Sequence, residues 1–322
     1  MDNGIKGRKF FVTGGAGFIG SVMVETLLKS GAGVVVYDNL SSGRLEFLKK
    51  FEGRDFRFIK GDLLDNATVE KAIASDAIDS VIHLAANPDV QRSMRETDLD
   101  LRMGTIATYN VLDAMRKNDV KEILFSSSSV VYGIPTVRPT PEDYGPLKPI
   151  SLYGASKLAS EGLITAFSHL FHMKYYIYRF ANVVGRNATH GVILDFAKKL
   201  RKNRKELEVL GNGRQRKSYI EVQDCVDGML YVHRHSGEDE NIYNLTTDDQ
   251  ASVEEIAELV IGKFAKDAKI RYTGTEQGWP GDIANTFLSN RKISRLGWKP
   301  RYTSIDAIRL TVDYVYDYLT GK

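Results

Sequence analysis

The sequence predicts an α/β protein in which a doubly wound parallel sheet is joined to a smaller, mixed α/β C-terminal lobe. Three observations lead to this prediction. The chain has 322 residues, 43% hydrophobic and 26% charged, which is typical of a globular protein large enough for two lobes. Short apolar strand patterns alternate with helical patterns over its first half. A glycine cluster separates the first strand from the first helix.

The first element is a strand, a turn and a helix over residues 9–31. The apolar run "FFV" precedes the turn, and apolar residues at helical spacing follow it. The turn contains four glycines. Gly15, Gly17 and Gly20 fit the pattern G-x-G-x-x-G, and Gly14 directly precedes it. Glycines permit the tight turn and the close approach of a ligand, and the N-terminus of a helix favours phosphate. This stretch therefore predicts a site for the pyrophosphate of a dinucleotide.

The second strand, "GVVVYDNL" at 33–40, ends near an acid that a dinucleotide site needs. Asp38 follows Gly20 by 18 residues, close to the usual spacing for the acid that binds the adenosine ribose hydroxyls. Because a carboxylate repels a 2′-phosphate, we expect NAD rather than NADP. Arg44 is the one nearby residue that argues for NADP.

Further strand patterns alternate with helical patterns up to the middle of the chain. The strands cover 56–65, 80–87, 121–133 and 174–185, and the helices include 104–117 and 153–170. This alternation predicts a Rossmann-type parallel sheet with helices on both faces. At the strand ends, Asp62 is within reach of an adenine edge, and residues 84–86 are expected to line the cofactor groove.

The composition excludes several other classes of protein. A net charge of +3 does not indicate a nucleic-acid partner, and the single cysteine, Cys225, cannot form an internal disulfide. The six histidines lack metal-ligand spacing, so no metal is expected. No apolar run reaches the ~18 residues of a membrane span. A strand pattern that begins at Lys9 leaves no room for a signal peptide, so we expect a cytoplasmic protein.

The stretch "SLYGASK" at 151–157 opens a predicted helix with a phenol and an ammonium group. Tyr153 and Lys157 are four residues apart, so their side chains share one face of the helix. Alone, such a pair is more often an ordinary helix surface than a catalytic pair. The serine run "SSSSVVYG" at 126–133, at the end of a predicted strand, supplies candidate hydroxyl partners.

Together these stretches resemble the extended short-chain dehydrogenase/reductase family, in the NAD-dependent epimerase/dehydratase branch that acts on nucleotide sugars. The matching stretches are "TGGAGFIG", "YDNLSSG", "GDLLD", "HLAA", "SSSSVVYG", "YGASK" and "RFANVVG", in the expected order up to about residue 187. Weaker matches follow at 210–224 and 296–300. The resemblance implies NAD as the cofactor and a UDP-sugar as the substrate.

The resemblance also assigns roles to the residues of the two motifs. Tyr153 would take a proton from a sugar hydroxyl while NAD takes the hydride. A free phenol has a pKa of ~10, and the positive charges of Lys157 and the nicotinamide would lower it. Ser128 would hydrogen-bond to the reacting oxygen, with Ser126 and Ser127 as weaker candidates. The implied cofactor-binding residues are Gly14, Gly17, Phe18, Ile19, Gly20, Asp38, Asn39, Ser42, Gly43, Asp62, Leu63, Leu84, Ala85, Ala86, Tyr153, Lys157 and Phe180.

The residues after Ser128 favour one reaction of this branch. Related 4,6-dehydratases carry Asp-Glu where this chain has Ser129 and Val130, and UDP-glucuronate decarboxylases keep the Glu. We therefore expect 4-epimerisation through a transient 4-keto sugar, on UDP-glucose and UDP-galactose and possibly on the N-acetylhexosamine pair. The alternatives are a UDP-uronate 4-epimerase, a 4,6-dehydratase or a non-enzymatic dinucleotide-binding regulator, although such regulators commonly lose the Tyr or the Lys.

The C-terminal part departs from the pattern of the branch at several positions. The predicted substrate-binding residues are Ser128, Tyr153, Asn182, Lys217, Trp279, Asp282 and Thr286. Lys217 and Trp279 stand where arginines are usual, Pro88 where a lysine is common, and Leu101 where an asparagine is common. Thr286 corresponds to a position where a tyrosine excludes an N-acetyl group, so a threonine is expected to admit one.

The resemblance implies two lobes and a homodimer. Residues 1–185 would bind NAD, with 219–247 returning to that lobe, and residues 186–218 and 248–322 would bind the nucleotide sugar. Two long helices of each subunit, roughly 95–117 and 153–170, would form a four-helix bundle. The apolar candidates for this contact are Leu112, Met115, Leu163, Phe167 and Leu170.

Overall fold

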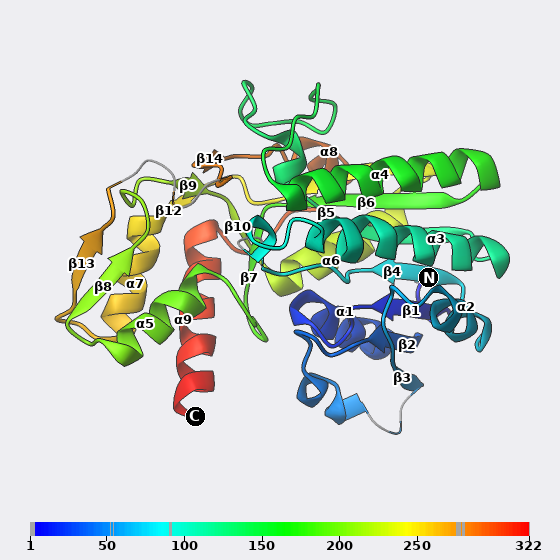
Figure 1. Cartoon of the computed structure of the whole chain (residues 1–322), viewed down its shortest axis with the longest axis horizontal. Helices are drawn as coiled ribbons and strands as arrows, with labels where there is room; N and C mark the ends of the chain where they lie inside the picture. Colours follow the sequence, from blue (N-terminus) through cyan, green and yellow to red (C-terminus); the bar gives the residue numbers. More distant parts are fainter. Residues whose placement is uncertain are drawn as a thin grey trace.

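The computed structural model describes residues 4–51, 53, 55–89, 92–274, 278 and 281–321. Within these residues, seven parallel strands form the sheet of the larger lobe in the order β11-β6-β5-β4-β1-β2-β3 (Figure 1). The strands are β1 Lys9–Thr13, β2 Gly33–Asp38, β3 Phe56–Lys60, β4 Ser80–His83, β5 Glu122–Ser128, β6 Lys174–Phe180 and β11 Glu240–Leu245. The predicted Rossmann-type sheet is confirmed.

Helices cover both faces of this sheet, and successive residues of a strand pack against opposite faces. Phe10 and Val12 belong to the core beneath two helices, whereas Phe11 belongs to the core beneath three others. Continuous apolar runs such as "FFV" arise because both faces are buried. The first pair of helices is α1 Phe18–Lys29 and α6 Val222–His235, and the second set is α2 Asn66–Ala74, α3 Ala107–Lys117 and α4 Leu152–Phe171.

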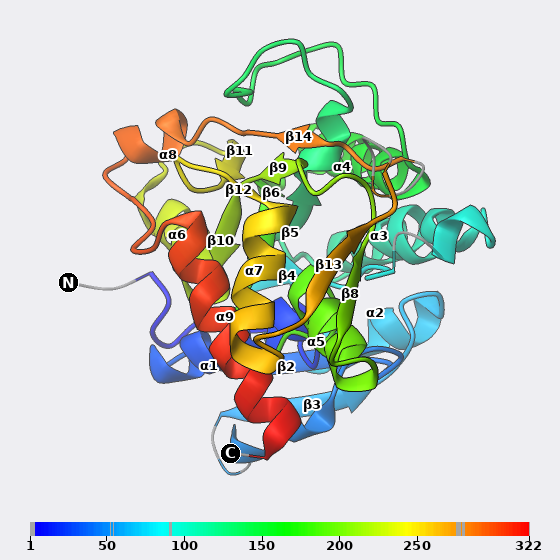
Figure 2. The ribbon, with the colours of Figure 1, turned by 90° about the vertical axis from the view of Figure 1, so that its left-hand side faces the viewer.

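The smaller lobe lies beside the carboxyl edge of the sheet (Figures 1 and 2). Its core is formed by three helices, α5 Val192–Lys202, α7 Val253–Phe264 and α9 Ser304–Thr320. Short strands complete it, namely β7 Asn182–Val184, β8 Glu206–Val209, β9 Arg216–Lys217, β10 Tyr219–Glu221, β12 Ala251–Ser252, β13 Lys269–Tyr272 and β14 Asn285–Thr286. Between β10 and β12 the chain returns to the larger lobe, where β11 pairs with β6.

Several short helical turns connect these elements. They are η1 Leu45–Phe47, η2 Lys49–Phe51, η3 Arg92–Met94, the π-helix η4 Leu101–Ile106, η5 Ser129–Tyr132 and the short helix α8 Arg291–Arg295. The π-helix η4 runs directly into α3 and packs against α4. Among the described helices, none is long and apolar enough to cross a membrane.

Two of the five residues predicted for a subunit contact belong to the core instead. Leu112 and Met115 are fully buried between α3 and the sheet. An apolar helix pattern does not distinguish a core face from a contact face, which explains this error. Leu170, at the end of α4, is exposed, and Leu163 and Phe167 are half-buried.

Candidate active site

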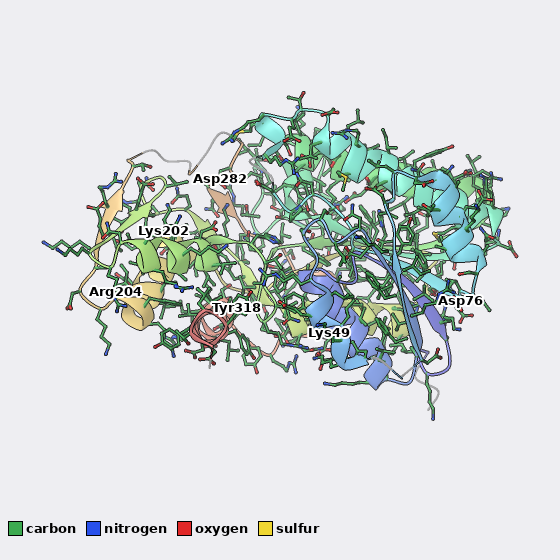
Figure 3. All side chains as sticks on the ribbon, turned by 60° about the horizontal axis from the view of Figure 1, so that its bottom comes forward. Lys49, Asp76, Lys202, Arg204, Asp282 and Tyr318 are labelled. Carbon is green, nitrogen blue, oxygen red and sulfur yellow. The ribbon has the colours of Figure 1, made fainter. Side chains whose placement is uncertain are left out.

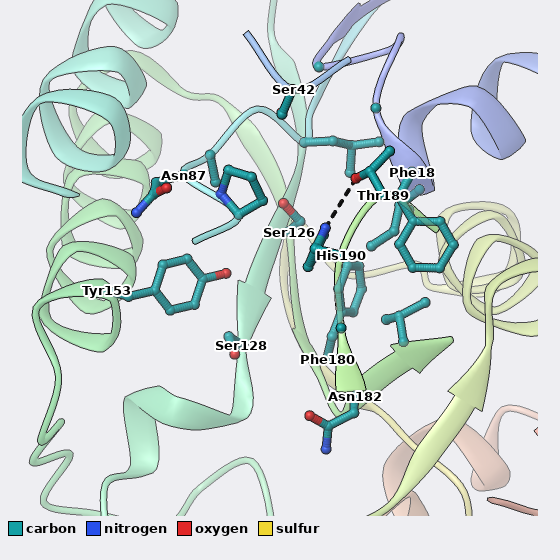
Figure 4. Close-up of a pocket in the computed structure, with 18 of the residues that line it drawn as sticks. Phe18, Ser42, Asn87, Ser126, Ser128, Tyr153, Phe180, Asn182, Thr189 and His190 are labelled. Atoms are coloured by element: carbon teal, nitrogen blue, oxygen red, sulfur yellow. Dashed lines mark hydrogen bonds between the residues drawn. The ribbon is translucent and has the colours of Figure 1, made fainter. Parts of the chain in front are cut away.

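A cavity of about 840 Å³ lies between the two lobes, at the carboxyl ends of the strands (Figure 4). Parallel α/β sheets commonly bind ligands at this edge. The predicted residues that line it are Gly14, Gly17, Phe18, Ile19, Gly20, Asp38, Asn39, Ser42, Asp62, Leu63, Leu84, Ala85, Ala86, Ser128, Tyr153, Lys157, Phe180, Asn182, Lys217 and Asp282. Gly43 and Thr286 are not among the lining residues, and Trp279 lies outside the described residues.

The glycine turn after β1 leaves bare backbone facing the cavity. Gly14 has a φ of +68°, and a Cβ there would lie 2.8 Å from the backbone of Ala85. A Cβ on Gly20 would collide with the carbonyl oxygen of Gly14. The helix α1 starts at Phe18 after Gly17, without a side-chain cap, so its first N–H groups stay available to an anion. This cradle fits the pyrophosphate of a dinucleotide.

Two carboxylates stand further along the same edge, at the ends of β2 and β3. Asp38 is buried and accepts hydrogen bonds from the N–H groups of Ala16 and Leu40, at 3.0 and 2.8 Å. Burial raises the pKa of Asp38, and these two bonds oppose the shift. The Asn39 amide donates to Asp62 at 3.1 Å. Both acids retain lone pairs for the hydroxyls and amines of an adenosine.

Tyr153 and Lys157 lie on the first turns of α4, whose start is fixed by Ser151 capping the N–H of Gly154 at 3.1 Å. The Tyr153 ring extends into the cavity toward β5, which carries Ser126 and Ser128 (Figure 4). The Lys157 ammonium lies 5.7 Å from the Tyr153 ring centre. It donates to the Ser126 carbonyl at 2.6 Å. The i, i+4 spacing therefore places both side chains at one site.

Burial shifts the pKa of both side chains. It lowers the pKa of Lys157 to about 8, although the charges of Asp100 and Glu161 oppose this shift. Burial, and then the charge of Asp100, raise the pKa of Tyr153. A base needs a lowered pKa, so this shift of the Tyr153 pKa has the wrong sign for catalysis. It arises because the protein groups around the phenol do not replace the hydration that a phenolate loses on burial. A positively charged group beside the phenol has to supply the remaining stabilisation of a phenolate.

The three serines at the end of β5 differ in what their hydroxyls contact. Ser126 donates to the carbonyl of His83 at 3.2 Å, and Ser127 donates to the Glu161 carboxylate at 2.5 Å. Ser128 accepts from the N–H of Val130 at 3.5 Å, and no acceptor for its own proton is found among the described residues. All three line the cavity. Ser128 is thus the serine whose hydroxyl can donate to a ligand.

A buried ion pair beneath this site was not predicted. Arg179 on β6 forms two hydrogen bonds with Glu161 on α4, at 2.7 and 3.0 Å, and both side chains are almost fully buried. Arg179 also donates to the Tyr132 hydroxyl at 3.0 Å and to the Glu142 carbonyl at 2.9 Å. These bonds fix α4, and therefore Lys157, against the sheet. In the sequence, Glu161 follows Lys157 by four residues, which is one helical turn, and this spacing was the feature that could have indicated an acid near the site.

His83 and Asp100 are two further buried polar residues near the site. His83 bonds to the hydroxyls of Thr13 and Thr108 at 2.7 and 3.0 Å. Burial and the charge of Lys157 lower its pKa to about 3, so it is neutral at pH 7. Asp100 accepts from the Asn87 amide at 3.0 Å, and its second oxygen has no hydrogen-bond partner among the described residues.

The second half of the cavity is lined by residues of the smaller lobe. Lys217 pairs with Asp282 at 2.5 Å, and the Asn182 amide donates to the Ser218 carbonyl at 3.2 Å. Three basic side chains that were not predicted line this half, namely Lys198, Lys199 and Lys202. The three lysines lie on α5 at positions that recur every three or four residues, and this spacing was the available signal.

Two of the sequence departures can also be placed. Pro88 lines the cavity beside Asn87, whereas Leu101 is exposed on η4 and does not line it. No cluster of three potential metal ligands occurs within the described part of the chain. The geometry as a whole provides a pyrophosphate cradle, two acids, and a Tyr–Lys–Ser group at one edge of the sheet.

Comparisons with known proteins agree with this arrangement. The model of the NAD dependent epimerase/dehydratase family matches residues 10–246. A UDP-glucose 4-epimerase of Mycolicibacterium smegmatis is 32% identical over 310 residues, which cover 94% of this chain and 97% of that protein. A solved UDP-galactose 4-epimerase is 38% identical, with a TM-score of 0.87, over 97% of this chain and 99% of that chain.

Other solved relatives are named for different sugars. A UDP-N-acetylglucosamine 4-epimerase of Methanobrevibacter ruminantium is 26% identical, with a TM-score of 0.85, over 98% of this chain and 100% of that chain. A UDP-glucuronic acid 4-epimerase of Bacillus cereus, in complex with UDP-glucuronic acid and NAD, is also 26% identical, with a TM-score of 0.85, over 96% of this chain and 99% of that chain. The family match and the predicted fold lead to one conclusion: the chain belongs to the NAD-dependent epimerase/dehydratase family, whose cofactor is NAD.

Proposed function

We propose that this protein is a UDP-sugar 4-epimerase that acts on UDP-glucose and UDP-galactose and also accepts their N-acetyl counterparts. The observation that carries the proposal is the group at the end of β5 and the start of α4. Tyr153 extends into the cavity, Lys157 lies beside it, and Ser128 has a hydroxyl free to donate. The names of the relatives at 32% and 38% identity support the same activity.

The three side chains divide the proton chemistry between them. NAD, when bound, supplies the acceptor and donor for the hydrogen at C4 of the sugar. Tyr153 removes the proton of the C4 hydroxyl as that carbon becomes a ketone, and returns a proton when C4 is reduced on its other face. Lys157 stabilises the phenolate through its charge. Ser128 donates a hydrogen bond to the reacting oxygen.

The residues after Ser128 favour epimerisation over dehydration. Dehydration requires an acid for the C6 hydroxyl and a base for the C5 proton. Ser129 is buried, and Val130 has no titratable group. With neither role filled at this position, a 4-keto sugar formed here is reduced again rather than dehydrated.

The second half of the cavity has the charge that a nucleoside diphosphate requires. Lys217, held by Asp282, faces it, and the α5 face adds Lys198 and Lys202, for which no ion pair is found among the described residues. Asn182 would contact the diphosphate from β7. In this arrangement the diphosphate lies near the lysines of α5, and the sugar extends toward Tyr153.

The proposal is tested by the substitution Tyr153→Phe, assayed with UDP-glucose, UDP-N-acetylglucosamine and UDP-glucuronate. We expect wild type to convert the first two, and the variant to lose about 10²- to 10⁴-fold in kcat because the acid–base group is gone. Bound NAD should be unchanged. Tyr314→Phe, on the exposed side of α9, is the matched control. Near-normal turnover by Tyr153→Phe would refute the assignment, and conversion of UDP-glucuronate alone would refute the substrate.

We place the protein in the cytoplasm.

The assembly that we propose is a homodimer. Apolar side chains are exposed along η4, α3 and α4, including Leu101, Ile106, Tyr109, Leu152 and Leu170. Burial of such a surface stabilises an association. Light scattering at micromolar concentration should give twice the subunit mass of 36.1 kDa. Leu170→Glu, at the most exposed of these positions, should yield the monomer. A wild-type monomer would exclude the dimer.

A further inference from the structure

The loop that follows β2 carries an arginine beside the adenosine site. Gly43 lies against Asp38, since a Cβ on Gly43 would be 2.9 Å from the Asp38 carboxylate. The N–H of Arg44 donates to the carbonyl of Ala16, in the glycine turn, at 2.8 Å. The backbone of Arg44 is thus fixed next to the acid that faces the ribose hydroxyls. In Rossmann folds, an arginine near this place commonly accommodates the 2′-phosphate of NADP.

The guanidinium of Arg44 is directed elsewhere, toward the C-terminal helix. It donates a hydrogen bond to the Tyr318 hydroxyl, and its centre lies 5.3 Å from the Tyr318 ring centre. It also lies 5.9 Å from the Phe47 ring centre and 3.4 Å from the Glu46 carboxylate. Tyr318 is on the last turn of α9, in the other lobe (Figure 3).

We infer that Tyr318 is a specificity-determining residue for NAD, which acts by holding the Arg44 guanidinium away from the cofactor's 2′ position. The contact combines a hydrogen bond with a cation–π interaction, and both compete with the ion pair that Arg44 could form with a 2′-phosphate. Asp38 and Tyr318 then act together: the first repels the phosphate, and the second withdraws the cation that would attract it.

The two elements packed against Arg44 contribute the other groups that could hold it. From the loop these are Glu46 and Phe47, and from α9 it is Tyr318. Glu46 is exposed, with 58% of its side chain accessible, so its ion pair with Arg44 is weak. Tyr318 is therefore the partner whose removal should release the guanidinium.

The test measures which dinucleotide the full-length protein binds, independently of any sugar substrate. Purified protein is equilibrated by prolonged dialysis against NAD and NADP in a fixed ratio, and the bound cofactors are quantified by mass spectrometry after denaturation. Tyr318→Ala should raise the bound NADP-to-NAD ratio by about three- to tenfold, which is the size expected for loss of an exposed cation–π contact with its hydrogen bond. Tyr318→Phe, which keeps the ring, should give a smaller rise.

Loss of Tyr318 could also change cofactor binding by weakening the contact between the two lobes, without involving Arg44. A double substitution distinguishes these two explanations. Arg44→Ala and the pair Arg44→Ala/Tyr318→Ala should show no rise, because the released cation is absent in both. Tyr314→Ala, one turn earlier on α9 and exposed, should behave as wild type. The inference is wrong if Tyr318→Ala leaves the ratio unchanged, or if the double variant shows the same rise. Neither result bears on the epimerase proposal, since no turnover is measured.

Discussion

The two halves of the cavity are built in different ways. The cofactor half is formed by the ends of adjacent strands of one sheet, and two of its charged groups are held by the backbone: Asp38 by two N–H groups and Lys157 by the Ser126 carbonyl. The sugar-nucleotide half is assembled from short strands far apart in sequence. There the Lys217–Asp282 pair joins β9 to a segment that is 65 residues further along the chain.

This difference indicates where the protein is rigid and where it can vary. A seven-stranded sheet covered on both faces closely determines where its strands end, so the positions of Asp38 and Lys157 depend little on any single surface contact. Strands of two or three residues, such as β9 and β14, provide no comparable frame. Changes of sugar specificity are therefore expected in the second half, and changes of reaction chemistry in the first.

Among substitutions that test the two halves of the cavity separately, Lys157→Met in the cofactor half is expected to have the largest effect on turnover. Loss of the charge beside Tyr153 should reduce kcat by at least about 100-fold. The same change should stabilise the fold by roughly 1–3 kcal/mol at pH 7, since a pKa lowered to about 8 means that burial of the ammonium disfavours folding. Urea unfolding and steady-state kinetics measure the two effects.

The pH dependence of this stability difference has a definite sign. The unfolded chain binds the Lys157 proton more tightly than the folded chain does, so this destabilisation is fully present below pH 8. It disappears as the pH rises from about 8 toward 10.5. The gain from Lys157→Met should shrink over the same range. Lys71→Met, on the exposed side of α2, should show neither effect, and a variant less stable than wild type at pH 7 would contradict the argument.

A smaller effect is expected in the other half, from Thr286→Tyr. Thr286 does not line the cavity, but it pairs with Lys217 across β14 and β9, and paired residues of neighbouring strands share a face. A tyrosine ring would extend from there toward the sugar. We expect about a tenfold loss of UDP-N-acetylglucosamine turnover with UDP-glucose turnover retained. Asn285→Tyr, whose side chain faces away, is the control. Equal loss of both activities in Thr286→Tyr would exclude a gate at this position.

The sequence was informative where a function depends on neighbours in the chain. The glycine turn, Asp38 and the Tyr153–Lys157 spacing are each encoded within one or two elements, so their meaning could be predicted before their positions were known. The Glu161–Arg179 pair and the Arg44–Tyr318 contact depend on segments that meet only in the fold. Leu112 and Met115 show the same limit, since an apolar face does not specify whether it packs on a sheet or on a second subunit.

The π-helical turn η4 restricts how this chain can change in length. A π-helical turn contains more residues than an α-helical turn, so deletion of one residue from Leu101–Ile106 would allow a continuous α-helix with α3. Because such a deletion removes the extra residue and not a rotation, the preceding segment would keep nearly the same orientation relative to α3. A one-residue deletion within α3 itself would instead rotate that segment by about 100°. Asp100 would leave its buried place beside Asn87, and the cavity wall at Asn87 and Pro88 would move. A one-residue deletion would thus damage the site when it falls in α3 and spare it when it falls in η4, so this turn is the place where the segment can change in length.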